Sequence, residues 1–176
     1  MNSYKRSSVV GNLARLVTTI AAAFFALVAV AVSPAQADVD GAGLANQRPD
    51  FPYNFCATPE GNSTANGTVV TLWKCNNNDL MLWRWRGDNL VHSVSGKCLT
   101  PRGNSYNNGT VLTLWTCTGS PVQDFQGTHG TRETIRTMHS DKCLTNYGGD
   151  VGNGVWVTLW TCDPKVPLEQ WWGWAG

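Results

Sequence analysis

Six cysteines mark out three similar segments in this chain. They are Cys56, Cys75, Cys98, Cys117, Cys143 and Cys162. The two cysteines of each successive pair are 19 residues apart, and the first cysteines of the pairs follow one another after 42 and 45 residues. Such regular spacing is typical of one structural unit copied three times. The repeat predicts three units of about forty residues that fold together, because one unit alone cannot bury its apolar face.

The residues before the second cysteine of each pair support this repeat. Asn-Gly at 66, 108 and 153 favours a tight turn, because both residue types tolerate a positive φ. A β-branched and apolar run follows each turn, as expected of a strand. Alternation places on a core face Val70, Leu72, Leu112, Leu114, Val157 and Leu159. It places on the opposite face Thr71, Trp73, Thr113, Trp115, Thr158 and Trp160.

The strand pattern predicts an all-β fold with pseudo-threefold symmetry. Further strands are expected at Leu90–Val94 and Thr134–Met138, and no stretch after residue 37 shows helical periodicity. A helical repeat of similar length is thereby excluded, and a propeller normally has at least four blades.

The cysteines pair most simply within each unit. Six cysteines allow 15 pairings in principle, and the repeat selects Cys56–Cys75, Cys98–Cys117 and Cys143–Cys162. Zinc binding is the rival use of cysteine, but the chain has no C-x-x-C pair. We therefore predict three disulfides, no metal site and no cofactor.

The N-terminal segment resembles a secretory signal peptide. Lys5, Arg6 and Arg15 precede an apolar stretch at 16–32, and Ala35-Gln36-Ala37 has the form that signal peptidase accepts. A transmembrane anchor is the alternative, but 17 residues are at the short limit for spanning a bilayer. We expect residues 1–37 to be removed, and 38–50 to form a loosely specified arm. The mature protein would be secreted, with no membrane span and with conditions that permit disulfides.

Composition excludes several classes of protein. The net charge is +1, or −2 without the three cationic residues of the leader, so no basic field is present for nucleic acid. Charged residues make up 14% of the chain, too few for a coiled coil or a disordered tail. Nine tryptophans indicate packing or stacking roles instead.

Three motifs resemble the ricin B-type β-trefoil lectins. Gly96-Lys97-Cys98-Leu99-Thr100 is similar to the family's G-K-C-L-D motif except at its last residue. L-W-x-C stands at 72–75, 114–117 and 159–162. Q-x-W stands at 170–172, with variants at 81–83 and 123–125. The resemblance covers about 51–176 and implies a β-trefoil with repeats at about 51–89, 90–133 and 134–176.

The resemblance also implies one shallow sugar pocket in each lobe. The family's stacking aromatic corresponds to Trp73, Trp115 and Trp160. Its carboxylate corresponds to Thr58, Thr100 and Thr145, and an uncharged hydroxyl forms a weaker hydrogen bond. The polar position before the motif's glutamine is Leu80, Val122 and Glu169. With Trp160, Thr145, Glu169 and Gln170, the third lobe is the expected sugar site.

Each candidate also has a purely structural interpretation. The three tryptophans can be packed under the loops of their own lobes, and Gln123 and Gln170 can serve the backbone of a turn. The three threonines can simply be good strand residues. The remaining motif tryptophans are expected in the core and hairpin packing, namely Trp83, Trp85, Trp171, Trp172 and Trp174.

The function predicted from the sequence is non-catalytic carbohydrate binding by a secreted monomer. The partner would be a glycan or polysaccharide. No nucleophile, metal or phosphate-loop motif is present, and His92, His129 and His139 are scattered, so no enzyme is predicted. The alternative is a secreted trefoil that binds protein, such as a toxin-delivery subunit or a protease inhibitor. The absence of a carboxylate from the family's three carboxylate positions would suit such a protein-binding trefoil.

Overall fold

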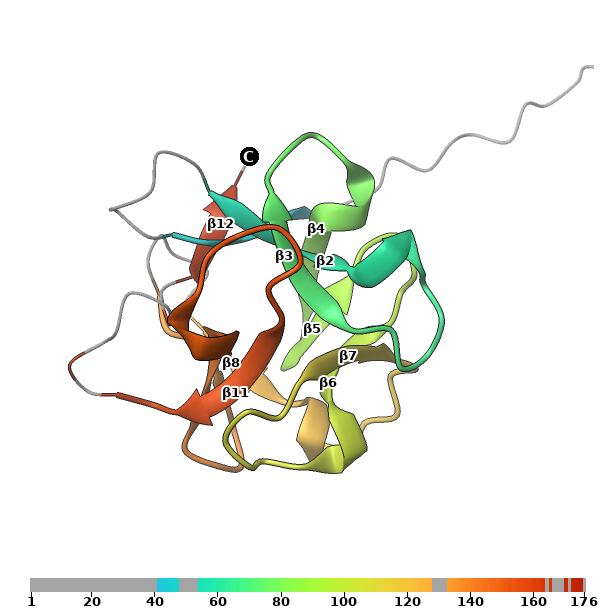
Figure 1. Cartoon of the computed structure of the whole chain (residues 1–176). Coiled ribbons are helices and arrows are strands. Elements are labelled where there is room, and N and C mark those ends of the chain that lie inside the picture. The colour runs from blue at the N-terminus through green and yellow to red at the C-terminus, as the bar shows by residue number, and fades with distance from the viewer. Residues whose placement is uncertain are drawn as a thin grey trace, which may run out of the picture. The chain divides into compact units, whose positions relative to one another are not determined.

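The computed structural model describes residues 41–47, 54–127, 133–163, 165, 170 and 172–175 (Figure 1). Twelve strands form within these ranges. They are β1 (Ala42–Asn46), β2 (Phe55–Pro59), β3 (Val70–Lys74), β4 (Leu82–Arg86), β5 (Asn89–His92), β6 (Cys98–Pro101), β7 (Leu112–Trp115), β8 (Phe125–Gln126), β9 (Arg136–Thr137), β10 (Lys142–Asn146), β11 (Val157–Thr161) and β12 (Trp172–Ala175). Four consecutive strands make up each lobe, beginning with β1, β5 and β9.

Six of these strands form a ring of antiparallel neighbours. β1 pairs with β4 and β12, β4 pairs with β5, and β8 pairs with β9. The bridge Asn89↔Asp124 joins the ends of β5 and β8, and the bridge Glu133↔Trp172 joins β12 to the segment before β9. The strands therefore close into a barrel.

The other six strands form three hairpins that cover this barrel. They are β2–β3, β6–β7 and β10–β11. The bridges Val69↔Thr113, Val111↔Thr158 and Thr71↔Trp156 join each hairpin to the other two. A closed barrel with three mutually paired hairpins is the β-trefoil that the sequence predicted (Figure 1).

The Asn-Gly turns connect neighbouring lobes as well as adjacent strands. The glycine N–H of each turn donates to a leucine carbonyl of another lobe at 2.8 Å. The asparagine Oδ1 accepts from a backbone N–H of that lobe. These bonds run from Thr116 to Asn66 at 3.1 Å, from Thr161 to Asn108 at 2.9 Å and from Lys74 to Asn153 at 2.9 Å. The first lobe thus binds the second, the second binds the third, and the third binds the first.

The core consists of layers that take one residue from each lobe. The layers are Leu44, Leu90 and Ile135; Val70, Leu112 and Val157; Leu72, Leu114 and Leu159; and Trp83, Phe125 and Trp172. All of these side chains are fully buried. The indole N–H of Trp83 donates to the carbonyl of Ala57 at 2.9 Å, and that of Trp172 to Leu144 at 3.0 Å. The core role expected for these two tryptophans is confirmed. Trp85 and Trp174 are partly buried against the core, and Trp171 lies outside the described residues.

The N-terminal boundary differs from the expectation. Residues 42–46, expected within a loose arm, form β1, in which Leu44 and Ala45 are buried. The ordered domain therefore begins before residue 51. The segment is short and contains glycine, so it has little strand propensity of its own. Its strand conformation comes from pairing with β2, β4 and β12.

The threonines of the central strands also differ from the expectation. Thr71, Thr113 and Thr158 were predicted on the face away from the core, yet all three are buried. Their hydroxyls donate across each hairpin to the carbonyls of Thr58, Thr100 and Thr145, at 3.3, 3.0 and 3.3 Å. Strand alternation predicted correctly to which side of the strand these side chains point. They are nevertheless buried, because neighbouring lobes cover this part of the outer face.

The three disulfides pair as predicted, Cys56–Cys75, Cys98–Cys117 and Cys143–Cys162. The proposed leader at 1–37 lies outside the described residues. Within the described ranges, no helical segment has the length and hydropathy needed to cross a bilayer.

Candidate functional site: exposed tryptophans beside the disulfides

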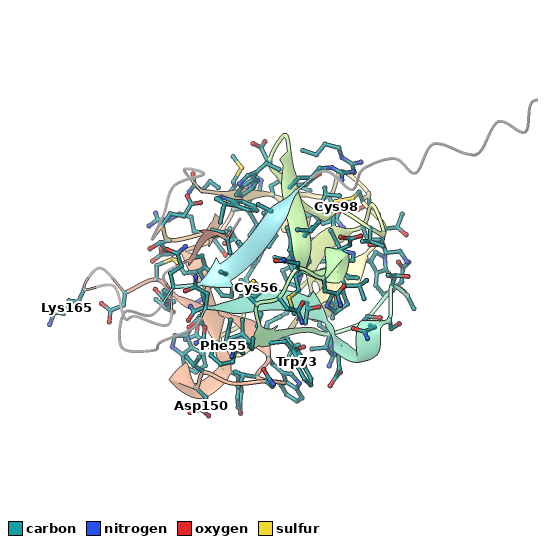
Figure 2. All side chains as sticks on the ribbon, turned by 90° about the horizontal axis from the view of Figure 1, so that it is seen from above. Phe55, Cys56, Trp73, Cys98, Asp150 and Lys165 are labelled. Atoms are coloured by element: carbon teal, nitrogen blue, oxygen red, sulfur yellow. A yellow bond between two sulfur atoms is a disulfide. The ribbon has the colours of Figure 1, made fainter. Side chains whose placement is uncertain are left out.

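One tryptophan in each lobe lies at the surface beside the disulfide. Trp73, Trp115 and Trp160 are 44%, 45% and 47% exposed. Each is paired across its hairpin with the first cysteine of the repeat. Directly opposed residues share a face of the sheet, so the indole and the disulfide lie on the same outer side. Figure 2 shows Trp73 at the outside of the first lobe. The predicted exposure of these three residues is confirmed.

The Asn-Gly turn of another lobe flanks the indole. A Cβ atom on Gly67 would lie 3.7 Å from Cζ3 of Trp115, and one on Gly109 would lie 3.7 Å from Cζ3 of Trp160. Both glycines have positive φ, at 86° and 81°, which favours glycine at this point. Two lobes together therefore build the surroundings of Trp115 and Trp160.

A hollow of about 510 Å³ lies over the first lobe. Trp73 lines it together with polar residues of four segments. The polar lining comprises Thr58, Asn62, Lys74, Asn76, Asn78 and Asn153. A hollow with one large aromatic surface and several amides suits a ligand that has both apolar faces and hydroxyl groups.

Two asparagines of this hollow, Asn76 and Asn78, use their side-chain carbonyl oxygens within the loop after β3. Oδ1 of Asn76 accepts from the N–H of Asn78 at 3.1 Å, and Oδ1 of Asn78 accepts from the N–H of Leu80 at 3.0 Å. Their side-chain NH2 groups are then the donors that can reach a bound molecule. Sequence reasoning missed these amides because the motif resemblance has no counterpart for them.

The threonines at the family's carboxylate position are buried. Thr58, Thr100 and Thr145 are 5%, 5% and 4% exposed. The Thr58 hydroxyl donates to the carbonyl of Leu80 at 3.2 Å, and that of Thr100 to the carbonyl of Cys98 at 3.0 Å. Thr145 Oγ1 lies 3.5 Å from its acceptor, the carbonyl of Asn146. All three hydroxyls are directed to backbone carbonyls of the fold.

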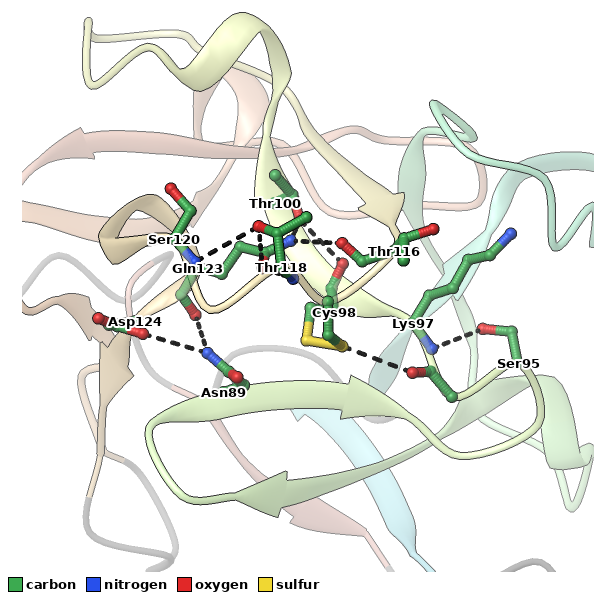
Figure 3. The surroundings of a disulfide bond; sticks show 12 residues. Asn89, Ser95, Lys97, Cys98, Thr100, Thr116, Thr118, Ser120, Gln123 and Asp124 are labelled. Atoms are coloured by element: carbon green, nitrogen blue, oxygen red, sulfur yellow. Dashed lines mark hydrogen bonds between the residues drawn. A yellow bond between two sulfur atoms is a disulfide. The ribbon is translucent and has the colours of Figure 1, made fainter.

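The glutamines of the Q-x-W motif form hydrogen bonds with the loop after the second cysteine of the repeat. Gln123 Nε2 donates to the hydroxyl of Thr100 at 2.9 Å and to the carbonyl of Thr116 at 3.0 Å, and its Oε1 accepts from the N–H of Thr118 at 2.8 Å (Figure 3). Gln170 makes the equivalent bonds, to Thr161 and from Asp163. Both side chains are buried.

In the third lobe, Trp160 is paired with Cys143 and is exposed, whereas Thr145 and Gln170 are buried. Glu169 lies outside the described residues. Of the two other residues at that position, Val122 is buried and Leu80 is partly buried.

The buried side chain of His92 makes a polar contact with a backbone carbonyl of the first lobe. His92 Nε2 lies 3.0 Å from the carbonyl oxygen of Leu80, the same atom that accepts from Thr58, and Nδ1 lies 2.8 Å from the hydroxyl of Ser95. Burial lowers the pKa of His92, and the bond to Leu80 offsets this in part. The histidine lies on β5 of the second lobe, contacts a carbonyl of the first lobe and does not line the hollow.

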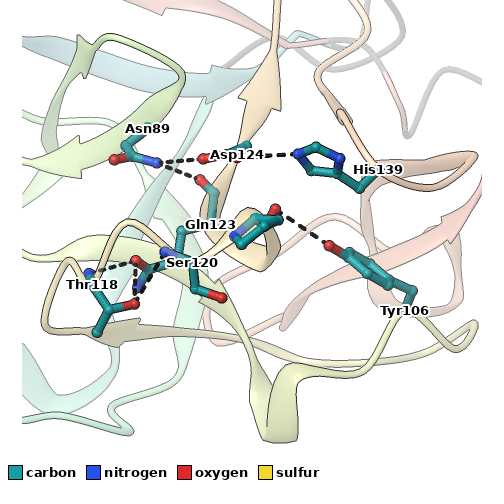
Figure 4. A network of polar contacts seen from close by, with 8 residues as sticks. Asn89, Tyr106, Thr118, Ser120, Gln123, Asp124 and His139 are labelled. Atoms are coloured by element: carbon teal, nitrogen blue, oxygen red, sulfur yellow. Dashed lines mark hydrogen bonds and ion pairs between the residues drawn. The ribbon is translucent and has the colours of Figure 1, made fainter.

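Asp124 is the centre of a polar network between the second and third lobes (Figure 4). Its carboxylate accepts from Asn89 Nδ2 at 3.2 Å and lies 3.1 Å from His139 Nε2. Burial raises the pKa of the nearby Tyr106 phenol, and the negative charge of Asp124 raises it further. The Tyr106 hydroxyl donates to the carbonyl of Pro121 at 3.3 Å. The contact between Asp124 and His139 joins the second lobe to the third, and the other contacts lie within the second lobe.

A second group of exposed aromatics occurs in the third lobe. Tyr147 and Trp156 are 52% and 42% exposed, and their ring centroids are 5.8 Å apart in an edge-to-face arrangement. The sequence contained a signal for this pair, because the position of Trp156 holds Val69 and Val111 in the other units.

The sequence and the fold both match known proteins. The family model of the ricin-type beta-trefoil lectin domain matches residues 47–172. No curated protein matches the chain significantly.

Several solved structures share the fold. The designed threefold-symmetric protein ThreeFoil has a TM-score of 0.64 at 21% identity, over 70% of this chain and 92% of ThreeFoil. The ricin B-like lectin of Macrolepiota procera, solved in complex with lactose, has a TM-score of 0.61 at 17% identity, over 78% of this chain and 95% of the lectin. The hemolytic lectin CEL-III has a TM-score of 0.62 at 26% identity, over 77% of this chain, which spans 30% of CEL-III.

Proposed function

The chain belongs to the ricin-type β-trefoil lectin domain family, and from this premise we propose that it is a non-catalytic carbohydrate-binding protein. The observation that carries the proposal is the exposed indole of Trp73 in a hollow lined by amides. One face of a sugar ring presents C–H groups that an indole can cover. The ring's hydroxyl groups can accept from the NH2 groups of Asn76 and Asn78.

The proposed sites are the surroundings of Trp73, Trp115 and Trp160. A shallow pocket binds weakly, so lobes that act together on one polysaccharide strengthen binding. The third lobe, with its sequence-predicted set of Trp160, Thr145, Glu169 and Gln170, remains our choice for one working site. The hollow at Trp73 makes the first lobe a second proposed working site. The lactose bound by the Macrolepiota procera lectin is consistent with a hydroxyl-rich ligand.

We further propose that the protein is exported and monomeric, with residues 1–37 acting as a cleaved leader. Three disulfides support an oxidising compartment, because such bonds persist mainly outside the cytosol. N-terminal sequencing of the exported protein tests the cleavage, and sedimentation velocity tests the monomer.

One observation favours the alternative of a protein-binding trefoil. The hydroxyls of Thr58, Thr100 and Thr145 are buried and directed to backbone carbonyls. The hydrogen-bonding half of the family's site is therefore weak, while exposed indoles can also contact protein.

A glycan array followed by titration calorimetry tests the main proposal. The variants are Trp73→Ala, Trp115→Ala and Trp160→Ala, which remove the same side chain from equivalent places. At ~25 cal/mol per Å², losing roughly 60 Å² of covered surface weakens binding by about 1.5 kcal/mol, or about tenfold. We expect this loss for Trp73→Ala and Trp160→Ala, and a smaller one for Trp115→Ala.

Two results would contradict the proposal. Wild-type protein that binds no glycan up to millimolar concentration, but retains a protein from an extract, would favour the protein-binding alternative. Release of new reducing ends from xylan, galactan or chitin by highly purified protein would contradict the absence of catalysis, provided that one carboxylate substitution abolished it.

A further inference from the structure

The aromatic pair Tyr147–Trp156 departs from the threefold repeat. Val69 and Val111 occupy the position of Trp156 in the other lobes, and both are 9% exposed. Glu60 and Arg102 occupy the position of Tyr147. The backbone bond is the same in all three lobes, since the N–H of residue 60, 102 or 147 donates to the carbonyl of residue 69, 111 or 156. Valine therefore satisfies the fold at this place, and packing does not require the exposed indole.

Trp156 shares a surface with Trp73 although the two belong to different lobes. Trp156 forms a bridge with Thr71, and directly opposed residues point to the same side. Trp73 stands two residues beyond Thr71 on β3, so it also points to that side. Diagonal neighbours of this kind lie roughly 7–8 Å apart, within reach of aromatic side chains. Thr71, between them in this pairing, is fully buried, whereas both indoles are exposed.

The hollow at Trp73 reaches the segment that leads to Trp156. Asn153 lines the hollow, and its Oδ1 accepts from the backbone N–H of Lys74 at 2.9 Å. The N–H of Gly154 donates to the carbonyl of Leu72 at 2.8 Å, and the N–H of Leu72 donates to Val155 at 2.7 Å. Three consecutive residues thus hold the segment against β3, so the two aromatic surfaces are fixed relative to each other.

We propose that Tyr147 and Trp156 form a second sugar subsite, which holds further units of a linear oligosaccharide whose first unit stacks on Trp73. This inference rests on the proposed function and extends it from a single sugar to a chain. An oligosaccharide repeats the same apolar C–H faces and hydroxyl edges, so units beyond the first two can use a second aromatic surface. The phenol hydroxyl of Tyr147 and the indole N–H of Trp156 provide polar edges beside apolar rings.

The test uses xylo-, cello-, galacto- and chito-oligosaccharides of two to six units in titration calorimetry with the full-length mature protein. The variants are Trp156→Val and Tyr147→Glu, which place at these positions the residues that the first lobe already carries. We expect wild-type affinity to rise about tenfold between two and four units for the series that binds. Trp156→Val should lose this rise and keep the wild-type affinity for the disaccharide. Trp73→Ala should lose binding at every length.

The outcomes separate this inference from the proposed function. If Trp156→Val gains affinity with length as wild type does, the second subsite is absent and the proposed function stands. Wild-type affinity that is equal for two and six units would also overturn the subsite. If no series binds wild type, both proposals fail. If sedimentation velocity finds a dimer that Trp156→Val abolishes, a second copy of the chain occupies this surface instead. Unchanged near-ultraviolet circular dichroism checks that each variant is folded.

Discussion

His92 is fully buried, and both of its ring nitrogens have a partner. The carbonyl of Leu80 can only accept, so Nε2 carries the proton, and Nδ1 accepts from the hydroxyl of Ser95. Burial disfavours the charged form of the ring. Burial lowers the pKa of His92 below its ordinary value, so between the two pKa values the unfolded chain binds a proton that the folded chain does not.

We therefore predict that the free energy of unfolding falls as the pH drops below about 6.5, by up to ~1.4 kcal/mol per pH unit. Urea unfolding between pH 7.5 and 5.5 measures the slope. The variant His92→Gln lacks the titrating group, so it should be less stable at pH 7.5 and show a shallower slope. An identical slope in the variant would assign the pH dependence to other groups.

Gln123 shows how residue type can mislead about a residue's role. A glutamine in the Q-x-W motif suggested a ligand contact, yet its amide makes hydrogen bonds to three residues of its own lobe. Sequence reasoning kept this structural role open but had no means of choosing it. The choice depends on whether the side chain is buried, and only the packed loop decides that.

The Asn-Gly turns act at the scale of the element, because each one holds a strand of another lobe. Asn108 Oδ1 accepts from the N–H of Thr161 at 2.9 Å, from its hydroxyl at 3.1 Å, and from Lys142 Nζ at 2.9 Å. The side chain is exposed, so water can replace part of what it provides.

We predict that Asn108→Ala lowers the free energy of unfolding by about 1–2 kcal/mol, because it leaves several donors without their acceptor. Urea denaturation measures this value. Asn107→Ala is the matched control, since it removes the same exposed side chain one residue earlier and should change stability by less than about 0.5 kcal/mol. Equal effects of the two substitutions would mean that the turn does not hold the neighbouring lobe.

Each disulfide joins the first strand of one hairpin to the segment directly after its second strand. Cys98 and Cys117 close a loop with a sequence separation of 19. We predict that the double substitution to serine costs about 2–5 kcal/mol. Thermal unfolding of the oxidised protein measures the loss, and wild type under reducing conditions should show a loss in the same direction. Unchanged stability would indicate that the hairpin holds its geometry through packing alone.

The whole molecule depends on β1 to close the barrel. β1 pairs with β2, β4 and β12, and Leu44 completes a core layer with Leu90 and Ile135. The first and last strands of the fold are thus neighbours in space, which local periodicity cannot reveal.

We predict that a chain beginning at residue 38 folds with one cooperative transition, whereas a chain beginning at residue 48 does not fold. Loss of β1 removes Leu44 from the core and exposes the edges of β4 and β12. Near-ultraviolet circular dichroism and calorimetry distinguish the two chains. A folded chain from residue 48 would restore the original view of this segment as an arm.

The amino-acid sequence by itself determined the threefold repeat, the all-β class, the disulfide pairing and the exposure of Trp73, Trp115 and Trp160. These features follow from spacing and alternation within about twenty residues, and three copies of the same pattern reinforce one another. Only the tertiary structure decided the strand character of residues 42–46, the burial of Thr58, Thr100 and Thr145, and the pairing of Trp156 with Thr71 of another lobe. Each of these depends on which lobes lie side by side, because burial and pairing across lobes join residues that are far apart in the chain.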